Sequence, residues 1–183
     1  DILTRVRDSG FSTLILTVDV PEASRREKQI RGGLSHPPKL TGRLGLQALM
    51  KPIWLGGILK VGIPRMKLMQ GYSNVKGRLS STEHIGYLLR TSPDINYLRK
   101  LRKKWDGTLI VKGIMKGSDA KLLEDEGVDA LWVSNHAGRQ FDGTFATIEV
   151  LPDIRVSSSL PIIFDSGVES GLDIIRALYS GAD

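Results

Sequence analysis

The sequence contains no cysteine among its 183 residues, and it has only three histidines. The absence of thiols excludes a disulfide framework, thiolate metal ligands and a cysteine nucleophile. The histidines show no HxxxH spacing, and no cluster of carboxylates accompanies them. A catalytic zinc site requires such ligands, so we expect no bound metal.

Long apolar runs are also missing. No stretch reaches the roughly 18 consecutive apolar residues that a membrane-spanning helix needs. The chain opens with DILTRVRD, which has neither an initiator methionine nor a signal-peptide pattern. A hydrophobic content of 40% and a charged content of 25% are typical of a globular protein and exclude wholesale disorder.

Acidic residues are absent from residues 39–79, although this segment holds eight lysines and arginines. Taking these eight from the 26 basic residues leaves 18 against 20 acidic residues in the rest of the chain. The formal charge of +6 therefore comes from one basic insert in a near-neutral body. A nucleic-acid-binding domain usually spreads its positive charge over a broader footprint, so we expect no nucleic-acid partner.

Short apolar runs alternate with helical patterns outside the insert. We expect strands at 14–20, 109–111, 130–134 and 161–164, and helices at 1–9, 93–104, 118–127, 146–156 and 170–180. Strands that are apolar throughout and separated by helices indicate a parallel sheet covered on both faces. Both a doubly wound sheet and a (β/α)8 barrel fit this pattern.

The ends of these strands favour the barrel. Asp19, Lys112, His136 and Asp165 each lie at or just after the carboxyl end of a different expected strand. Barrel enzymes assemble their active sites at this face. Four strands make half a barrel, and the chain stops at SGAD, where another strand would be expected. We therefore predict an α/β fold, a partial (β/α)8 TIM barrel from a longer protein.

The most distinctive motif is SNHAGRQ at residues 134–140. A histidine just after a strand can act as a general base near neutral pH. An arginine three residues later can hold a substrate carboxylate in a bidentate grip. Taken alone, the two residues could equally be a loop histidine and a solvated arginine.

The whole heptapeptide resembles the active-site signature of the FMN-dependent α-hydroxy-acid dehydrogenases and oxidases, which include L-lactate dehydrogenase, mandelate dehydrogenase and glycolate oxidase. Three further segments resemble this family in the same order: Thr17-Val18-Asp19 with Arg25-Arg26-Glu27, Ile110-Val111-Lys112-Gly113, and Phe164-Asp165-Ser166-Gly167-Val168. They are similar to its fourth-, fifth- and seventh-strand segments. The resemblance covers nearly the whole chain except a long insert after strand four.

The resemblance implies oxidation of an L-2-hydroxy acid to the 2-keto acid, with two electrons passed to FMN. Lactate is the first expected substrate and mandelate the second. His136 would be the base that takes a proton from the substrate, and Asp19 would orient and stabilise the resulting imidazolium. Arg139, with Arg26 as a helper, would bind the substrate carboxylate.

The resemblance also implies cofactor contacts. Lys112 would lie near the N1/C2 edge of the flavin, where a cation stabilises the reduced ring. Thr17 and Ser134 would hydrogen-bond the flavin, and Asp165 and Gly167 belong to the flavin-phosphate segment.

Two residues of the phosphate segment depart from the family pattern. The family usually has a second glycine where Ser166 stands and an arginine where Glu169 stands. A carboxylate in place of a phosphate-facing cation reverses the local charge. We therefore do not expect Glu169 to bind the phosphate.

The insert contains KPIWLGGILKVGIPRMKLMQGY at residues 51–72. Apolar and basic side chains without acidic ones suit a segment that lies on an anionic membrane surface. A segment that packs on its own barrel or on a neighbouring subunit is the alternative. We expect Gly56-Gly57, Gly62 and Pro64 to interrupt any continuous helix.

Membrane-bound dehydrogenases of the family carry their membrane-associating segment in this same connection. The resemblance therefore implies a cytoplasmic enzyme attached peripherally to the inner face of the cell membrane through residues 50–72, with a membrane quinone as electron acceptor. We also expect a homo-oligomer when the protein is intact.

We describe residues 1–183 as one incomplete barrel domain with the basic insert at 39–79. Without the remaining strands, we expect this stretch alone to be inactive. Two other interpretations stay open. One is a flavin-free, phosphate-binding barrel isomerase or synthase, and the other is an inactive fragment that serves as a membrane-binding or interaction module.

Overall fold

The computed structural model describes residues 2–20, 31, 41–62, 93–141 and 143–183. The chain divides into two compact units, one made of Asp1–Ser24 with Thr91–Asp183 and the other of Arg25–Arg90. We describe each unit by itself.

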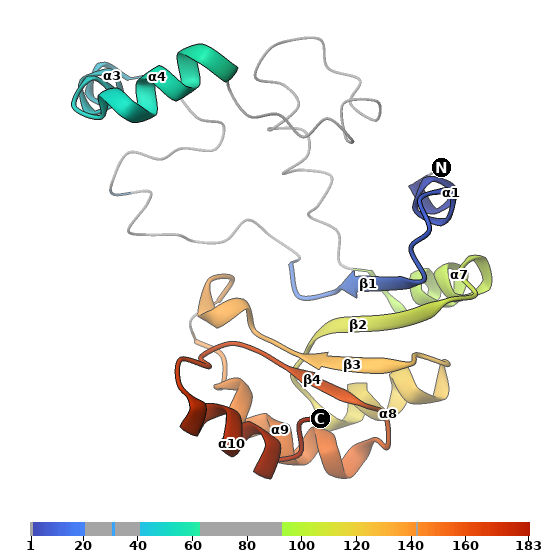
Figure 1. Ribbon diagram of the computed structural model, residues 1–183. Coiled ribbons are helices and arrows are strands. Elements are labelled where there is room, and N and C mark those ends of the chain that lie inside the picture. The colour runs from blue at the N-terminus through green and yellow to red at the C-terminus, as the bar shows by residue number, and fades with distance from the viewer. Residues whose placement is uncertain (1, 21–30, 32–40, 63–92, 142) are drawn as a thin grey trace. The chain divides into compact units, whose positions relative to one another are not determined.

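In the described part of the first unit, one sheet of four parallel strands follows the chain order β1-β2-β3-β4 (Figure 1). The strands are β1 (Thr13–Thr17), β2 (Thr108–Ile114), β3 (Ala130–Val133) and β4 (Ile162–Phe164). Thr17 pairs in register with Lys112, Lys112 with Trp132, and Trp132 with Ile163. The carboxyl ends of all four strands therefore meet at one edge of the sheet.

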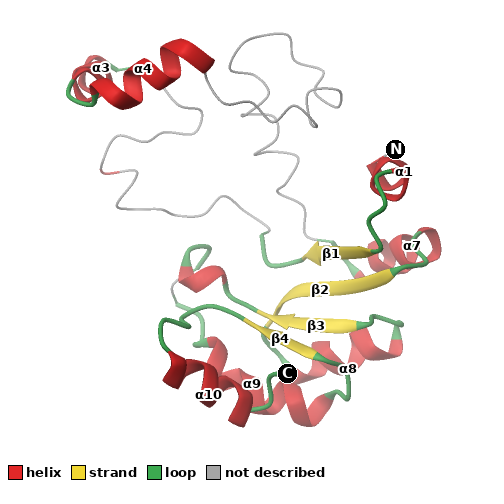
Figure 2. Ribbon diagram, in the orientation of Figure 1, coloured by secondary structure: helices red, strands yellow, loops and turns green. Residues whose placement is uncertain are grey.

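Helices alternate with the strands, as the sequence pattern predicts. They are α1 (Ile2–Asp8), α7 (Ile95–Lys104), α8 (Gly117–Asp125), α9 (Thr147–Ser157) and α10 (Gly171–Tyr179). Helices α8 and α9 lie together along one face of the sheet (Figure 2). The parallel sheet with its helical connections confirms the predicted half of a (β/α)8 barrel.

The hydrophobic core lies between this helical layer and the sheet. Alternate residues of β2 and β3 and the first residue of β4 are almost fully buried there, namely Leu109, Val111, Leu131, Val133 and Ile162. They share the core with Leu98, Leu101, Trp105, Leu123, Leu151 and Ile154 of the helical layer. Residues of the opposite pleat point to the other face, where Ile15 and Ile163 remain 46% and 37% exposed. In a closed barrel this second face is the interior.

The second unit is described through α3 (Gly42–Leu49) and α4 (Pro52–Val61), which contact each other. Helix α4 runs unbroken through Gly56-Gly57 and ends at Gly62, whose φ is 79°. The expectation that the glycine pair interrupts the helix was wrong, because two glycines lower helix propensity without removing a backbone hydrogen bond. The expected break at Gly62 is present, and Pro64 lies outside the described residues. No helix in the described ranges is long and apolar enough to cross a membrane.

Candidate functional site

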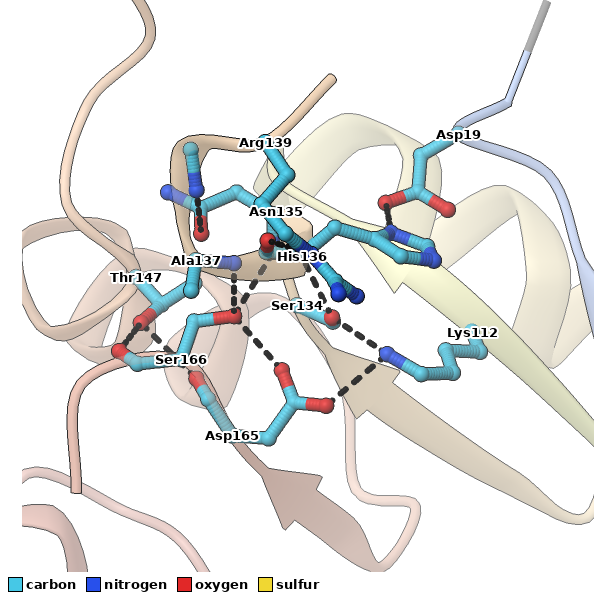
Figure 3. A network of polar contacts seen from close by, with 11 residues as sticks. Asp19, Lys112, Ser134, Asn135, His136, Ala137, Arg139, Thr147, Asp165 and Ser166 are labelled. Atoms are coloured by element: carbon cyan, nitrogen blue, oxygen red, sulfur yellow. Dashed lines mark hydrogen bonds and ion pairs between the residues drawn. The ribbon is translucent and has the colours of Figure 1, made fainter. Parts of the chain in front are cut away.

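The site is built around a histidine–carboxylate pair at the carboxyl edge of the sheet. Asp19 lies two residues beyond β1, and His136 begins the short 3-10 helix η1 (His136–Gly138) after β3. His136 Nδ1 and Asp19 Oδ2 are 2.6 Å apart, and the two side chains are only 19% and 17% exposed (Figure 3). The parallel sheet thus joins two residues that are 117 positions apart in the chain.

The backbone of the histidine loop is in an unusual conformation. His136 and Ala137 have φ values of 54° and 53°, in the left-handed region that residues with a Cβ rarely adopt. The Asn135 side chain stabilises the loop, because it accepts a hydrogen bond from the Gly138 amide at 3.3 Å and donates one to the Phe145 carbonyl at 3.1 Å. Contacts with neighbouring segments therefore hold the loop in a backbone conformation that His136 and Ala137 disfavour, and this conformation sets the direction of the imidazole.

Gly113 creates the space for Asp19. It lies where the register of β2 against β3 shifts between Lys112 and Ile114, and its φ is +104°. A Cβ at Gly113 would come within 2.4 Å of the Asp19 Cγ. Sequence reasoning did not single out this role, although a glycine inside a strand often signals a bulge or a close approach.

Lys112 supplies a cation at the same edge. Its Nζ lies 2.8 Å from Asp165 Oδ2 and donates to the Ser134 hydroxyl (Figure 3). It also lies 4.8 Å from the centre of the Trp132 ring. The Lys112 side chain is 15% exposed. A weakly solvated cation of this kind interacts more strongly with a nearby negative group than a surface lysine does.

Asp165 is an ionised carboxylate beside the Lys112 cation. Burial by itself would raise the pKa of the Asp165 carboxyl, but hydrogen bonds from Lys112, Ser134 and Ser166 and the charge of Lys112 outweigh it. The pKa of Asp165 is therefore held below its usual range, and this carboxyl is ionised at neutral pH.

Ser166 links the two loops in a way that the sequence did not reveal. Its hydroxyl accepts hydrogen bonds from the Asn135 and Ala137 amides at 3.2 and 3.1 Å and donates to Asp165 Oδ1 at 2.7 Å (Figure 3). The Thr147 hydroxyl donates to the carbonyls of Asp165 and Ser166 from the first turn of α9. Sequence reasoning treated Ser166 only as a departure from a glycine and did not find Thr147.

The remaining predicted residues occupy the following places. Thr17 ends β1 beside Lys112, and Ser134 is completely buried. Gly167 has a φ of +102° and open space where a Cβ would stand. Arg139 is exposed and donates through Nε to the His136 carbonyl at 3.2 Å. Arg26 lies outside the described residues.

The flavin that the sequence implies has two parts that these side chains must suit, its ring and its phosphate. The poorly solvated Lys112 cation, with the Thr17 and Ser134 hydroxyls in its neighbourhood, matches the needs of a ring that becomes anionic on reduction. The loop after β4 offers open backbone at Gly167 but carries no cation between residues 165 and 170. Lys112, Thr17 and Ser134 therefore suit the ring of FMN, whereas the loop after β4 presents backbone groups rather than a cation to the phosphate.

The fold and this edge define the class of protein: half of an α/β barrel whose strand ends carry a carboxylate-paired histidine and a partly buried lysine. The model of the FMN-dependent dehydrogenase family matches residues 1–183. The chain belongs to this family of FMN-dependent oxidoreductases, which confirms the family and the cofactor predicted from the four motifs.

Curated relatives agree with this assignment. The chain is 36% identical over 189 residues to an L-lactate dehydrogenase of Vibrio cholerae serotype O1, covering 100% of this chain and 49% of the relative. It is 37% identical over 186 residues to an L-lactate dehydrogenase of Pseudomonas syringae pv. syringae, covering 98% of this chain and 48% of the relative. The chain thus spans about half the length of these relatives.

Solved structures show the same fold. The monotopic membrane protein (S)-mandelate dehydrogenase superposes with a TM-score of 0.85 at 28% identity, over 98% of this chain and 48% of that chain. A mandelate oxidase superposes with a TM-score of 0.68 at 25% identity, over 100% of this chain and 44% of that chain. The family match does not favour a flavin-free barrel enzyme.

Proposed function

We propose that this chain supplies the base, the carboxylate-binding arginine and part of the flavin site of an enzyme that oxidises an L-2-hydroxy acid to the 2-keto acid. L-lactate is the first proposed substrate and mandelate the second. The observation that carries the proposal is the 2.6 Å contact between His136 and Asp19 at the sheet edge that also holds Lys112. Relatives named L-lactate dehydrogenase and (S)-mandelate dehydrogenase support the substrate class.

His136 is proposed to move the proton. Because Asp19 engages Nδ1, Nε2 is the nitrogen that accepts a proton from the substrate. The imidazole becomes a cation in this step, and the adjacent Asp19 carboxylate stabilises it. The 2-hydroxy acid loses two protons and two electrons in all: His136 takes one proton, and the other proton and both electrons would go to FMN when it is bound.

The substrate carboxylate is assigned to Arg139, with Arg26 as a second cation. Arg139 follows His136 on the same loop, so a carboxylate bound there would place the neighbouring carbon near the imidazole. Lys112, Thr17 and Ser134 are assigned to binding the ring of FMN.

Asp165 and Gly167 are assigned to the phosphate segment of the FMN site. Asp165 acts through Lys112, because its carboxylate is paired with that cation. Gly167 would offer its backbone amide to the phosphate, as open glycine loops do.

The function is tested in the full-length, FMN-loaded protein by anaerobic mixing with L-lactate while the flavin absorbance is followed. We expect L-lactate to bleach the flavin, with mandelate slower and D-lactate without effect. His136→Asn should retain FMN but reduce it about 10²–10⁴-fold more slowly, the range that a general base contributes. Val156→Ser, an exposed change on α9, is the control and should reduce at the unmodified rate. A protein that takes up no FMN, or whose flavin no 2-hydroxy acid bleaches, would refute the proposal.

The location of the enzyme is part of the same proposal. We assign residues 50–72 to the inner surface of the cell membrane and a membrane quinone to the role of electron acceptor, with a homo-oligomer as the intact form. Exposed Ile53, Leu59 and Val61 on α4 and the absence of any acidic residue between 39 and 79 support the surface attachment. So does the monotopic membrane character of the similar (S)-mandelate dehydrogenase.

A further inference from the structure

Ser166 lies between the loop after β4 and the loop that carries His136. Its hydroxyl accepts from the amides of Asn135 and Ala137, the two residues that flank the histidine. One side chain thus binds the backbone on both sides of His136. Figure 3 shows the Ser166 hydroxyl pointing toward this backbone and toward Asp165.

The conformation of both loops is one that residues with a side chain disfavour. Among the described residues, the non-glycine positions with positive φ are His136, Ala137 and Ser166, at 54°, 53° and 78°. Such residues persist where surrounding contacts over-determine them, and they often mark functional sites. Here the Ser166 hydroxyl supplies two of those contacts.

The same hydroxyl connects the histidine loop with the lysine. Ser166 donates to Asp165 Oδ1, while Lys112 binds Oδ2 of the same carboxylate. Ser134 completes the circuit, because its hydroxyl accepts from Lys112 and from the His136 amide. The ionised Asp165 carboxylate therefore accepts the hydrogen of the Ser166 hydroxyl and orients that hydroxyl.

We propose that Ser166 is a positioning residue for His136: its hydroxyl fixes the backbone at 135–137, directs the imidazole toward Asp19, and ties this geometry to the Lys112–Asp165 pair. The inference rests on the proposed role of His136 as the base. A loosened loop would leave the substrate and FMN contacts in place but reduce the time that the imidazole spends in the reactive orientation.

Two substitutions separate the hydroxyl from the backbone strain. Ser166→Ala removes the hydroxyl and keeps the Cβ, whereas Ser166→Gly removes the hydroxyl and also relieves the left-handed strain. In the full-length, FMN-loaded protein, both should slow flavin reduction about tenfold, because the histidine loop loses the hydrogen bonds that align the base. The KM for the hydroxy acid and the FMN content should stay within about twofold, since the variants lose alignment of the base rather than binding. Ser157→Ala removes an exposed hydroxyl that bonds only the Asp153 carbonyl in the described structure and serves as the matched control.

Hydrogen exchange provides a readout that needs neither substrate nor FMN. In the full-length protein, the amides of Asn135 and Ala137 should exchange about tenfold faster in both Ser166 variants than in the unmodified protein and in Ser157→Ala. Unchanged exchange at these amides together with unchanged flavin reduction in Ser166→Gly would overturn the positioning role. If none of the 2-hydroxy acids reduces the flavin of the unmodified protein, the proposed function fails. The exchange result still decides whether Ser166 holds the loop.

Discussion

At the scale of single residues, the site depends as much on a missing side chain as on those that carry charge. Asp19 reaches His136 because Gly113 has no Cβ, and a Cβ there would lie 2.4 Å from the Asp19 Cγ. Real Cβ atoms do not approach other atoms this closely, so a larger residue would displace the carboxylate. Gly113 thereby governs the distance between Asp19 and His136.

Gly113→Ala is expected to slow flavin reduction about 100-fold and to destabilise the protein by about 1–3 kcal/mol, through the displaced Asp19 and the positive φ. Gly127→Ala is the matched control, since Gly127 also has a positive φ, +77°, but open space at the Cβ position. We expect this control to lose stability and to keep the rate of reduction. Stopped-flow absorbance and urea unfolding measure the two effects. Equal rates in the two variants would show that the Asp19 contact is not what Gly113 protects.

At the scale of secondary-structure elements, the order of strands and helices follows from the sequence, but the capping of helices does not always do so. Ser170 caps α10, and its hydroxyl accepts from the Asp173 amide. Ser118 opens the helix expected at 118–127, but it lies inside α8, whose N-cap is Lys116 with no side-chain bond. The Gly117 amide instead donates to the Asp153 carboxylate of α9 at 2.9 Å.

Asp153→Ala should therefore lower the free energy of unfolding by about 1 kcal/mol, because it leaves an amide at the start of α8 without its acceptor. Asp125→Ala is the control: Asp125 also belongs to α8, but its ion pair with Lys121 is exposed on both sides. Such surface pairs contribute little, so we expect a smaller change. Urea unfolding of both variants tests this, and equal losses would contradict the link between α8 and α9.

At the scale of the whole molecule, the two units carry different properties. The first unit holds the parallel sheet and the site at its carboxyl edge. The described helices of the second unit expose apolar side chains, with Ile53, Leu59 and Val61 at 93%, 78% and 81% exposure. The basic excess of the chain also belongs to this insert. Asp19, His136 and Lys112 thus belong to the first unit, and the segment proposed for membrane attachment belongs to the second.

Ile53→Ser combined with Leu59→Ser is expected to reduce co-sedimentation of the full-length protein with vesicles of anionic phospholipid by about tenfold, since each change removes apolar area from the interface. Flavin reduction by the hydroxy acid should be unchanged. Val156→Ser removes an equally exposed apolar residue from α9 and should leave binding as it was. Deletion of residues 50–72 with no change in membrane fractionation would refute the attachment.

The sequence alone was sufficient for the class of fold, the family and its cofactor. Apolar runs separated by helical patterns indicate a parallel sheet, and charged or titratable residues at successive strand ends indicate where the active site lies. These features are local in the chain, so they can be recognised without coordinates. The same holds for His136 and Lys112, which stand in short motifs.

Only the tertiary structure decided how these residues meet. The 2.6 Å contact between Asp19 and His136 depends on strand register and on the space at Gly113, neither of which a linear pattern records. The role of the Ser166 hydroxyl depends likewise on two loops that come together from different strands. Hydrogen bonds between distant segments act over about 3 Å, and folding, not spacing along the chain, determines which atoms come that close.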